Sequence, residues 1–246
     1  MDLAGKVALV TGGKRIGATV AVALAEAGAD LALSYHRSKP EAETTAGAVR
    51  ALGRRAMTCQ ADLADPDACR RLVAAAAREL GRLDVLVNMA SIYTRTPFAD
   101  LTAEDLQRSF DVEVKSAFAC AQSAAPLMAA AGGGRIINVS DWLAASDRPR
   151  YTGFLAYYVA KKAVIGLTEA LALELAPDQI LVNAIAPGPI LPPPDLDEEE
   201  TRAVETATPL GRWGGAEEIA RTVLALVDSN FITGETFRVD GGRHIR

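Results

Sequence analysis

Short apolar segments alternate with longer helical patterns along the chain, and this alternation restricts the fold more than any other feature. Residues 7–11, 30–35 and 83–88 are nearly continuous runs of Val, Leu, Ile and Ala, and each precedes a helical stretch. Gly28 and Gly53 follow two of these stretches, where glycine is typical of a helix C-cap. Strands without polar alternation, separated by helices, predict a doubly wound parallel sheet with helices on both faces.

The whole chain is expected to form one α/β domain with a Rossmann fold of about seven strands. No composition break or internal repeat divides residues 1–246. The proline-rich, acidic stretch at residues 187–200 cannot be a sheet strand, and we expect a substrate lid around residues 187–210; a solvated surface loop is the alternative. Helices are expected at residues 16–27, 40–52, 65–80, 103–131, 153–175 and 216–228, and further strands at 55–60, 135–139, 180–185 and 235–239.

Composition argues against several classes of function. A net charge of −5 and a pI near 5.2 provide no electrostatic footprint for nucleic acid or an anionic membrane. The N-terminus has no signal-peptide pattern, and no apolar run reaches the length of a membrane span. Three scattered cysteines and two distant histidines predict neither disulfides nor a metal site. We expect a cytoplasmic protein that acts on a small molecule.

The segment VTGGKRIGAT, residues 10–19, lies where a nucleotide-binding protein has its phosphate loop. It does not match G-x-G-x-x-G, and it places Lys14 and Arg15 where small residues are usual. Its context is nevertheless correct, because a buried strand turns at Gly12 directly into a helix that begins near Ile16. Backbone N–H groups at such a helix start bind a pyrophosphate. We therefore predict a dinucleotide site here.

The end of the second strand predicts which dinucleotide binds. An acidic residue at this place would bind a ribose 2′-hydroxyl, whereas an Arg beside a Ser suits a 2′-phosphate. Together with the cations of the first loop, this favours NADP(H) over NAD(H); solvated surface charges are the alternative. At the end of the third strand an Asp could meet the adenine amino group or cap a turn. The candidate residues are His36, Arg37, Ser38, Asp62 and Leu63.

The stretch YYVAKKAV suggests an acid–base pair on one helix face. Tyr157 and Lys161 are four residues apart, and so are Tyr158 and Lys162. A phenol is a poor catalyst at neutral pH unless a neighbouring cation lowers its pKa. Spacing alone does not choose between the two pairs.

Four segments in order, VTGG, VNMAS, YYVAKKA and VNAIAPGPI, resemble the short-chain dehydrogenase/reductase family over essentially the whole chain. The family motif Y-x-x-[SA]-K-x-[AG] fits Tyr157 and Lys161. The resemblance implies that Tyr157 donates a proton, that Lys161 binds the nicotinamide ribose and lowers the tyrosine pKa, and that the protein is a homotetramer. The family's phosphate loop, T-G-x-x-x-G-x-G, is one residue longer than this one. Further cofactor contacts implied by the resemblance are Asn88, Ala90, Pro187, Gly188 and Ile190.

The chain departs from the family pattern at two positions. Alignment of RIINVSD places Asp141 where the family has a substrate-orienting Ser, while Ser140 comes one residue early and points to the other side. In addition, Glu113 replaces the Asn of V-N-x-K, which puts the family's water-mediated proton relay in doubt. Glu113 is expected either to hold a water or to lie on the surface.

These departures resemble the pteridine reductase branch of the family, including bacterial dihydromonapterin reductases. That branch has Asp at the Ser position, an Arg in the phosphate loop, a Y-H-R-S-like turn and an aromatic residue after N-x-A-S. A carboxylate suits a nitrogen heterocycle with N–H donors. By this resemblance a pterin ring stacks on Tyr93, Ser91 and Arg15 hold its polar edge, and Asp141 orients it.

Two other functions remain open. A 3-oxoacyl thioester or other carbonyl reductase needs a hydroxyl that orients the substrate, which only Ser140 or Ser146 could supply. An NADPH-binding sensor without catalysis is the non-enzymatic alternative, and the intact Tyr157 and Lys161 pair argues against it.

Overall fold

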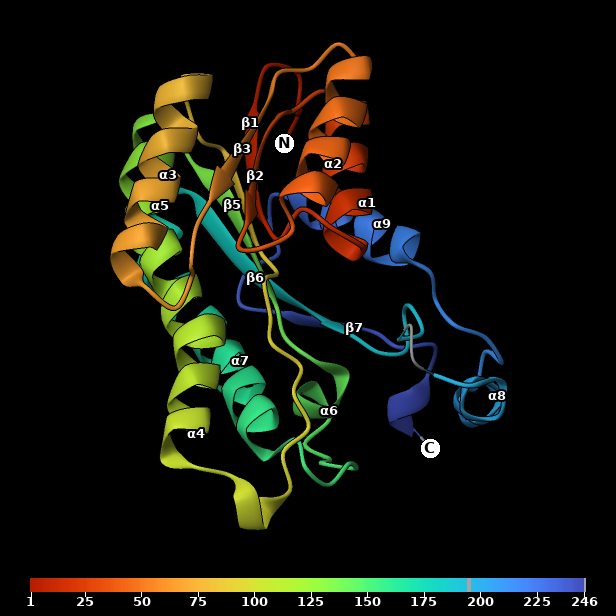
Figure 1. The fold of residues 1–246 in the computed structure, drawn as a ribbon. Coiled ribbons are helices and arrows are strands. Elements are labelled where there is room, and N and C mark those ends of the chain that lie inside the picture. The colour runs from red at the N-terminus through yellow and green to blue at the C-terminus, as the bar shows by residue number, and fades with distance from the viewer. Residues whose placement is uncertain (194–195, 246) are drawn as a thin grey trace.

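The computed structural model describes residues 1–193 and 196–245, which form one layer of parallel strands between two layers of helices (Figure 1). The strand order is β3-β2-β1-β4-β5-β6-β7, and every pairing is parallel. This confirms the predicted doubly wound Rossmann fold. The strands are β1 (Val7–Thr11), β2 (Asp30–Tyr35), β3 (Ala56–Gln60), β4 (Val85–Asn88), β5 (Gly134–Val139), β6 (Ile180–Pro187) and β7 (Thr236–Val239).

Helices cover both faces of the sheet. On one face, α1 (Ile16–Glu26) packs between α2 (Lys39–Ala51) and α9 (Ala216–Asp228); on the other, α3 (Pro66–Leu80) packs against α5 (Ser116–Ala130) (Figure 1). Beyond α5, α4 (Ala103–Phe110) contacts α7 (Leu155–Leu175). None of the helices in the described part of the chain is long and apolar enough to cross a membrane.

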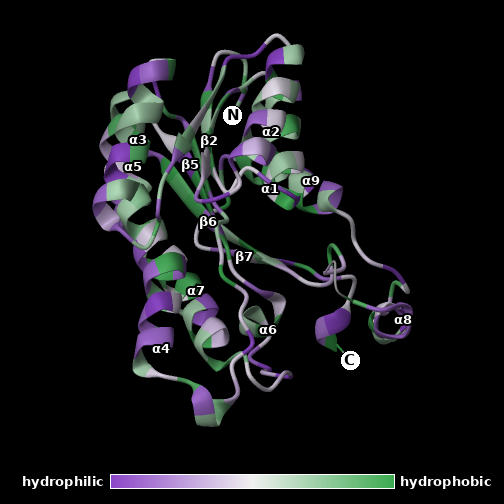
Figure 2. Cartoon of the chain, viewed as in Figure 1, coloured by the Kyte–Doolittle hydropathy of each residue, from purple (hydrophilic) through white to green (hydrophobic). Residues whose placement is uncertain are grey.

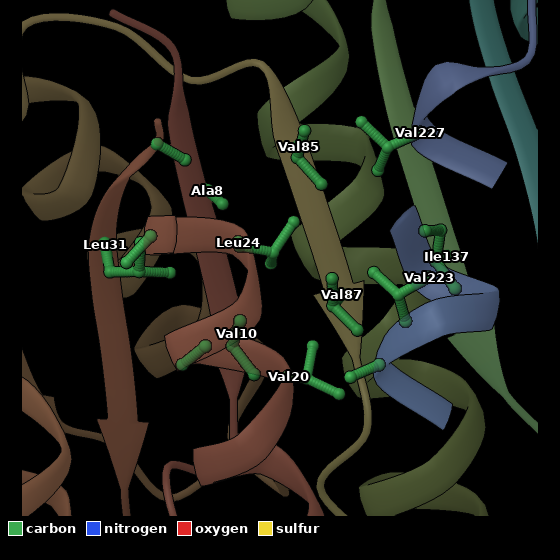
Figure 3. Close-up of a cluster of buried hydrophobic side chains, with 14 of the residues drawn as sticks. Ala8, Val10, Val20, Leu24, Leu31, Val85, Val87, Ile137, Val223 and Val227 are labelled. Carbon is green, nitrogen blue, oxygen red and sulfur yellow. The ribbon is translucent and has the colours of Figure 1, made fainter. Parts of the chain in front are cut away.

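The sheet is buried on both faces because its strands consist mainly of Val, Leu, Ile and Ala. Figure 2 shows apolar residues concentrated toward the sheet and polar ones on the outer helix surfaces. In one core cluster, Val10 and Val87 of the central strands meet Val20 and Leu24 of α1 and Val223 of α9 (Figure 3). A second cluster lies between the sheet and α3 and α5. This burial of apolar surface is the main stabilising contribution to the domain.

The order of the strands creates a crevice at one edge of the sheet. From β1 the chain proceeds outward to β2 and β3, and then returns to place β4 on the other side of β1. Thr11 and Asn88, which end these two central strands, lie opposite each other in the register. A reversal of this kind leaves a ligand crevice at the carboxyl ends of the strands. The predicted site residues lie beyond this edge.

The long helix expected at residues 103–131 runs without a break from Ala103 to Ala130, but its hydrogen-bond pattern changes in the middle. Between α4 and α5 it contains a π-helical turn, η2 (Asp111–Lys115), which shifts the helical register by an extra residue per turn. The turn buries both Val112 and Glu113. A surface position for Glu113 was one of the two expectations, and it is wrong for this physical reason.

Two local details also differ from the expected elements. A four-residue helix, α6 (Trp142–Ala145), follows β5, and Asp141 caps it by accepting a hydrogen bond from the Leu143 N–H at 2.8 Å. β6 continues to Pro187, so the proline-rich stretch starts inside the sheet rather than after it.

The expected lid at residues 187–210 contains a short helix. This helix, α8 (Glu198–Ala207), begins with a capping box in which Asp197 and Glu200 each accept the other's backbone N–H. Residues 194 and 195 lie outside the described residues. The function of this segment as a lid stays a prediction.

A buried carboxylate at the opposite edge of the sheet ties β1 to β4. Asp84, whose side chain is 1% exposed, accepts a hydrogen bond from the Val7 N–H at 3.0 Å and two from Arg82 at 2.6 and 2.7 Å, and Lys6 lies 3.4 Å away. Burial raises the pKa of Asp84, but the bonds from Arg82 and Val7 outweigh it, so the pKa lies below its ordinary value.

We predict that Asp84→Asn lowers the free energy of unfolding near neutral pH by about 2 kcal/mol, because one ionic partner of a buried cluster is removed. A lowered pKa stabilises the fold above the ordinary pKa of Asp, and this contribution disappears as the pH falls through the folded-state value. Urea unfolding of both proteins should therefore differ at neutral pH and converge in acid. The exposed Asp178→Asn serves as control. Equal stability of Asp84→Asn and the wild type at neutral pH would contradict this account.

Candidate active site

A cleft of about 820 Å³ runs along the carboxyl ends of the central strands. It brings together residues that are far apart in the sequence, from the phosphate loop to the end of β6. Ser140 also lines it, together with residues that were not predicted as site residues, namely Ser34, Met89, Ile92, Arg108, Val112, Val139 and Ile219. The predicted residues in the lining are Gly12, Lys14, Arg15, Ile16, His36, Arg37, Ser38, Asp62, Leu63, Ala90, Ser91, Tyr93, Asp141, Tyr157, Lys161, Pro187 and Gly188.

Two glycines shape the phosphate loop. Gly12 has a φ of 93°, in the left-handed region, and its N–H faces the Ser34 hydroxyl at 3.3 Å. Gly17 begins α1 so close to the loop that an added Cβ would lie 1.8 Å from the Gly12 carbonyl oxygen. Only glycine fits at Gly17, which gives the short loop a tight turn directly into the helix. This close packing of loop and helix is the cradle that a pyrophosphate requires.

The two cations of this loop are exposed at the cleft. Arg15 has a φ of 52°, an uncommon conformation for a residue other than glycine, and it stands immediately before α1. Its guanidinium donates to the Pro192 carbonyl at 3.1 Å, which links the phosphate loop to the proline-rich segment. Contacts of Lys14 with a 2′-phosphate and of Arg15 with a pyrophosphate stay predictions.

The other end of the cleft contains the residues predicted to bind the adenosine. His36 and Asp62 approach within 3.9 Å, and Gln60 fixes the turn by donating to the His36 carbonyl at 3.0 Å. Arg37 follows His36 directly, is exposed, and lines the same cleft as Lys14. The combination of a glycine cradle with cations from two separate loops fits a dinucleotide with a 2′-phosphate.

Two of the predicted cofactor residues do not line the cleft. The Asn88 side chain is buried and donates to the Asn138 side-chain oxygen at 3.0 Å, and Asn138 in turn donates to Thr168 of α7. Ile190 is buried in the core cluster next to α9. Asn88 therefore supports the strand end, and Ile190 packs the fold, because both side chains turn away from the crevice.

Tyr157 and Asp141 form the centre of the site. The Tyr157 hydroxyl, carried by the first turns of α7, donates to Asp141 Oδ2 at 3.1 Å. The other carboxylate oxygen of Asp141 accepts the Leu143 N–H of α6. Burial raises the pKa of Asp141 above its ordinary value although these bonds oppose it. The carboxylate is therefore held in place and lies directly against the phenol.

Lys161 is paired with Glu113. The Lys161 ammonium lies 2.7 Å from Glu113 Oε2 and donates to the Val139 carbonyl at 2.7 Å, and both charged side chains are only 2% exposed. Burial, Asp141 and Glu113 raise the pKa of Tyr157 well above its ordinary value. The pairing with Glu113 offsets the charge of the Lys161 ammonium, and the lowering of the Tyr157 pKa by Lys161 stays a prediction.

The alternative acid–base pair is not assembled. Lys162 forms an ion pair with Asp147 and donates to the Ala144 carbonyl at 3.2 Å. Neither Lys162 nor Tyr158 lines the cleft, whereas Tyr157 and Lys161 both do. The geometry selects Tyr157 and Lys161.

Neither serine near the site offers a free hydroxyl to a substrate. Ser140 donates to the Lys161 carbonyl at 2.8 Å, and Ser146 donates to the Trp142 carbonyl at 2.5 Å. Ser91 donates to Glu113, so its hydroxyl is also engaged. The polar group that faces the Tyr157 hydroxyl is the Asp141 carboxylate.

An aromatic pocket adjoins the cleft at Tyr157. Tyr93 stacks on Phe154 with ring centroids 4.5 Å apart, and it meets the Tyr157 ring edge-on at 4.9 Å. A cavity of about 420 Å³ extends from these rings and is also lined by Tyr151 and Asp141. Tyr93 and Tyr157 line both spaces, so a flat substrate could contact the phenol while a side arm occupies the pocket. Phe154 was not anticipated from the sequence.

The described residues contain no group of three or more His, Cys, Asp or Glu side chains placed to hold a metal ion.

Comparison with known proteins places this architecture in a family. A family model described as enoyl-(acyl carrier protein) reductase matches residues 11–244. A 3-oxoacyl-[acyl-carrier-protein] reductase, FabG, of Staphylococcus aureus is 37% identical over 98% of both chains. A short-chain dehydrogenase/reductase from Serratia marcescens superposes with a TM-score of 0.91 at 37% identity, covering 99% of this chain and all of the other. A blue fluorescent protein from a metagenomic library, solved in complex with NADPH, has a TM-score of 0.91 at 37% identity, with 99% of each chain covered.

The chain therefore belongs to the short-chain dehydrogenase/reductase family and is an oxidoreductase.

We predict that Arg37→Ala reduces the preference for NADPH over NADH by about 10- to 100-fold, because charge-assisted hydrogen bonds to the 2′-phosphate are lost. Dissociation constants of both cofactors, measured by nucleotide fluorescence, provide the readout. Arg50→Ala on α2, whose partner is Glu43, is the matched control. An unchanged preference in Arg37→Ala would contradict the assignment.

We also predict that Asp141→Asn raises the thermal stability at pH 7. A carboxyl whose folded-state pKa is raised costs stability once the pH exceeds the ordinary Asp value, and costs nothing below it. Asn retains the helix cap to Leu143 without the buried charge. Thermal unfolding should show a higher Tm for the variant at pH 7 and a smaller difference near pH 4; a lower Tm at pH 7 would contradict this.

Proposed function

We propose that this member of the family is an NADPH-dependent reductase of a pterin-type substrate, such as a dihydropteridine or a dihydrofolate. The observation that carries the proposal is the contact between the Tyr157 hydroxyl and the buried Asp141 carboxylate. A carboxylate is placed where a carbonyl reductase needs a hydroxyl, and the two nearby serines donate to the main chain instead.

A carboxylate of this kind suits a ring that offers N–H donors. After its bonds to Tyr157 and Leu143, Asp141 retains lone pairs that can accept from an exocyclic amino group or a ring N–H. A ketone oxygen, by contrast, would face a negatively charged acceptor and be repelled. Tyr93 provides an aromatic face beside the reacting position, which favours a flat heterocycle.

The cofactor is NADP(H) in this proposal. Gly12 and the start of α1 would hold the pyrophosphate, Arg37 and Lys14 the 2′-phosphate, and Pro187 and Gly188 would border the nicotinamide. When bound, NADPH supplies the hydride for the reduction.

Side chains of the protein supply the remaining chemistry, which is proton transfer. The C=N bond of the substrate becomes CH–NH by gaining a hydride at carbon and a proton at nitrogen, and Tyr157 supplies the proton. Its raised pKa keeps the phenol protonated until a basic nitrogen approaches. The tyrosinate that remains regains a proton from solvent, and the Asp141 carboxylate, which accepts from the Tyr157 hydroxyl at 3.1 Å, orients the phenol for the next turnover.

A second candidate is the reduction of a 3-oxoacyl thioester. It is favoured by the identity of 37% to FabG of Staphylococcus aureus over nearly the whole chain. The aromatic pocket could accommodate an acyl chain, but the candidate requires a substrate carbonyl to bind beside Asp141. The non-catalytic sensor receives no support from the assembled Tyr157 and Asp141 pair.

We expect NADPH oxidation by the purified protein to be stimulated by dihydrobiopterin or dihydrofolate and not by an acetoacetyl thioester. Tyr157→Phe should lower the turnover number by about 100-fold or more without weakening NADPH binding, because only the proton donor is removed. Stimulation by the thioester alone would overturn the pterin assignment in favour of the second candidate. Full turnover by Tyr157→Phe would refute the proton donor.

NADPH oxidation with the pterin and with the thioester also tests whether Asp141 recognises the substrate. Asp141→Ser should lose activity with the pterin and gain activity with the thioester, because a hydroxyl can donate to a ketone oxygen. Equal pterin activity of this variant and the wild type would exclude the carboxylate as the recognition element.

The assembly is proposed to be a homotetramer. Several apolar side chains are exposed on α5 and α7, namely Phe118, Leu155, Val159 and Leu173, and this surface suits contact with further copies of the chain. Light scattering of the purified protein gives the oligomeric mass directly.

A further inference from the structure

Glu113 occupies an unusual place for a carboxylate. It lies on the π-helical turn between α4 and α5, is almost fully buried, and takes part in contacts with three separate partners. Its Oε2 faces the Lys161 ammonium at 2.7 Å, and its Oε1 accepts from the Ile92 N–H at 3.0 Å and from the Ser91 hydroxyl. The Glu113 side chain thus connects α7, the helix formed by α4, η2 and α5, and the loop after β4.

The ion pair removes the charge effect of Lys161 on the proton donor. The Lys161 ammonium lies 5.6 Å from the centre of the Tyr157 ring, close enough to stabilise a tyrosinate if its charge were free. The titratable groups that face Tyr157 are Asp141 at the end of β5, Glu113 of the π turn, Tyr93 of the loop after β4, and Lys161 of its own helix. Two carboxylates therefore oppose one ammonium around the phenol.

The contacts to Ser91 and Ile92 hold the substrate side of the site. These two residues directly precede Tyr93, whose ring meets Tyr157 edge-on. With the Ile92 N–H and the Ser91 hydroxyl fixed by Glu113, the start of this loop is tied to the same side chain that neutralises Lys161. Glu113 therefore both neutralises the ammonium near the Tyr157 phenol and fixes the start of the loop that carries the Tyr93 ring.

We propose that Glu113 is a positioning residue that commits the site to proton donation, by neutralising Lys161 and fixing the loop that carries Tyr93. The inference rests on the proposed role of Tyr157 as proton donor, but not on the identity of the substrate. Reduction uses the phenol and continues over the pH range in which Tyr157 is protonated. Oxidation of the reduced product needs the tyrosinate as base, and it is confined to alkaline pH.

The primary test is Glu113→Gln, which removes the charge with little change of volume. With Lys161 no longer neutralised, the pKa of Tyr157 falls. The alkaline limb of the pH–rate profile for reduction moves to lower pH, and product oxidation at neutral pH rises by about tenfold or more. Asp111→Asn is the matched control, since it neutralises a partly exposed carboxylate of the same turn, paired with Lys115 rather than Lys161, and should leave both profiles unchanged.

A second readout does not require turnover. Tyrosinate absorbance is titrated in Glu113→Gln with and without Tyr157→Phe, so that the difference reports Tyr157 alone. The tyrosinate should form at lower pH in Glu113→Gln than in the wild type. In the double variant Glu113→Gln with Lys161→Met, which removes both charges, the titration should return toward the wild-type pH.

The loop contact is separated from the charge by Ser91→Ala. This variant retains the ion pair, so tyrosinate should form at the wild-type pH, while KM for the substrate rises more than kcat falls. The proposal is overturned if Glu113→Gln titrates like the wild type, or if the double variant titrates like Glu113→Gln. A failure of the pterin assay with these titrations as expected would refute the substrate assignment and leave the role of Glu113 intact.

Discussion

The buried ion pair between Glu113 and Lys161 is the interaction on which the site depends. It joins η2, the π turn between α4 and α5, to α7 and, through Ser91 and Ile92, to the loop that follows β4. A buried pair costs desolvation that only good geometry and additional hydrogen bonds offset, and here Val139, Ser91 and Ile92 supply those bonds. These contacts link the Lys161 ammonium to the loop that carries the Tyr93 ring.

Burial makes charged groups in the site unfavourable, and it thereby also changes the pKa values of the side chains at its centre. Asp141 and Tyr157 both have raised pKa values, because partial burial disfavours the charged form of each side chain. The phenol of Tyr157 and the carboxylate of Asp141 thus lie in direct contact, each with its charged form disfavoured. Active sites commonly concentrate such perturbed groups at the expense of stability.

Much of the fold could be predicted from the sequence because its signal is local and repeated. The strands β1, β2 and β4 are apolar runs with glycine-terminated helices between them, and their buried faces leave no other parallel arrangement. The edge of the sheet that forms the site could be predicted as well, since Gly12 and Asp141 closely follow strands of this sheet and Pro187 ends one.

What the sequence did not reveal depends on register and on three-dimensional contacts. The helix around Glu113 has an ordinary periodic pattern, so nothing local indicates the π turn that buries it. Ile190 and Asn88 belong to matching motifs, yet their side chains point into the core because of strand and loop geometry. The neutralisation of Lys161 could not be foreseen without the distance to Glu113.

The central claim is that the fold holds Tyr157 as a protonated donor. NMR of protein containing ring-labelled ¹³C-tyrosine, with Tyr157→Phe used to assign the signal, measures this protonation state directly. The account predicts that the Tyr157 signal remains that of a phenol up to pH 10, the ordinary value for this side chain, in the cofactor-free protein. A signal that titrates to tyrosinate between about pH 6 and 8, as a group in its catalytic range would, would contradict it.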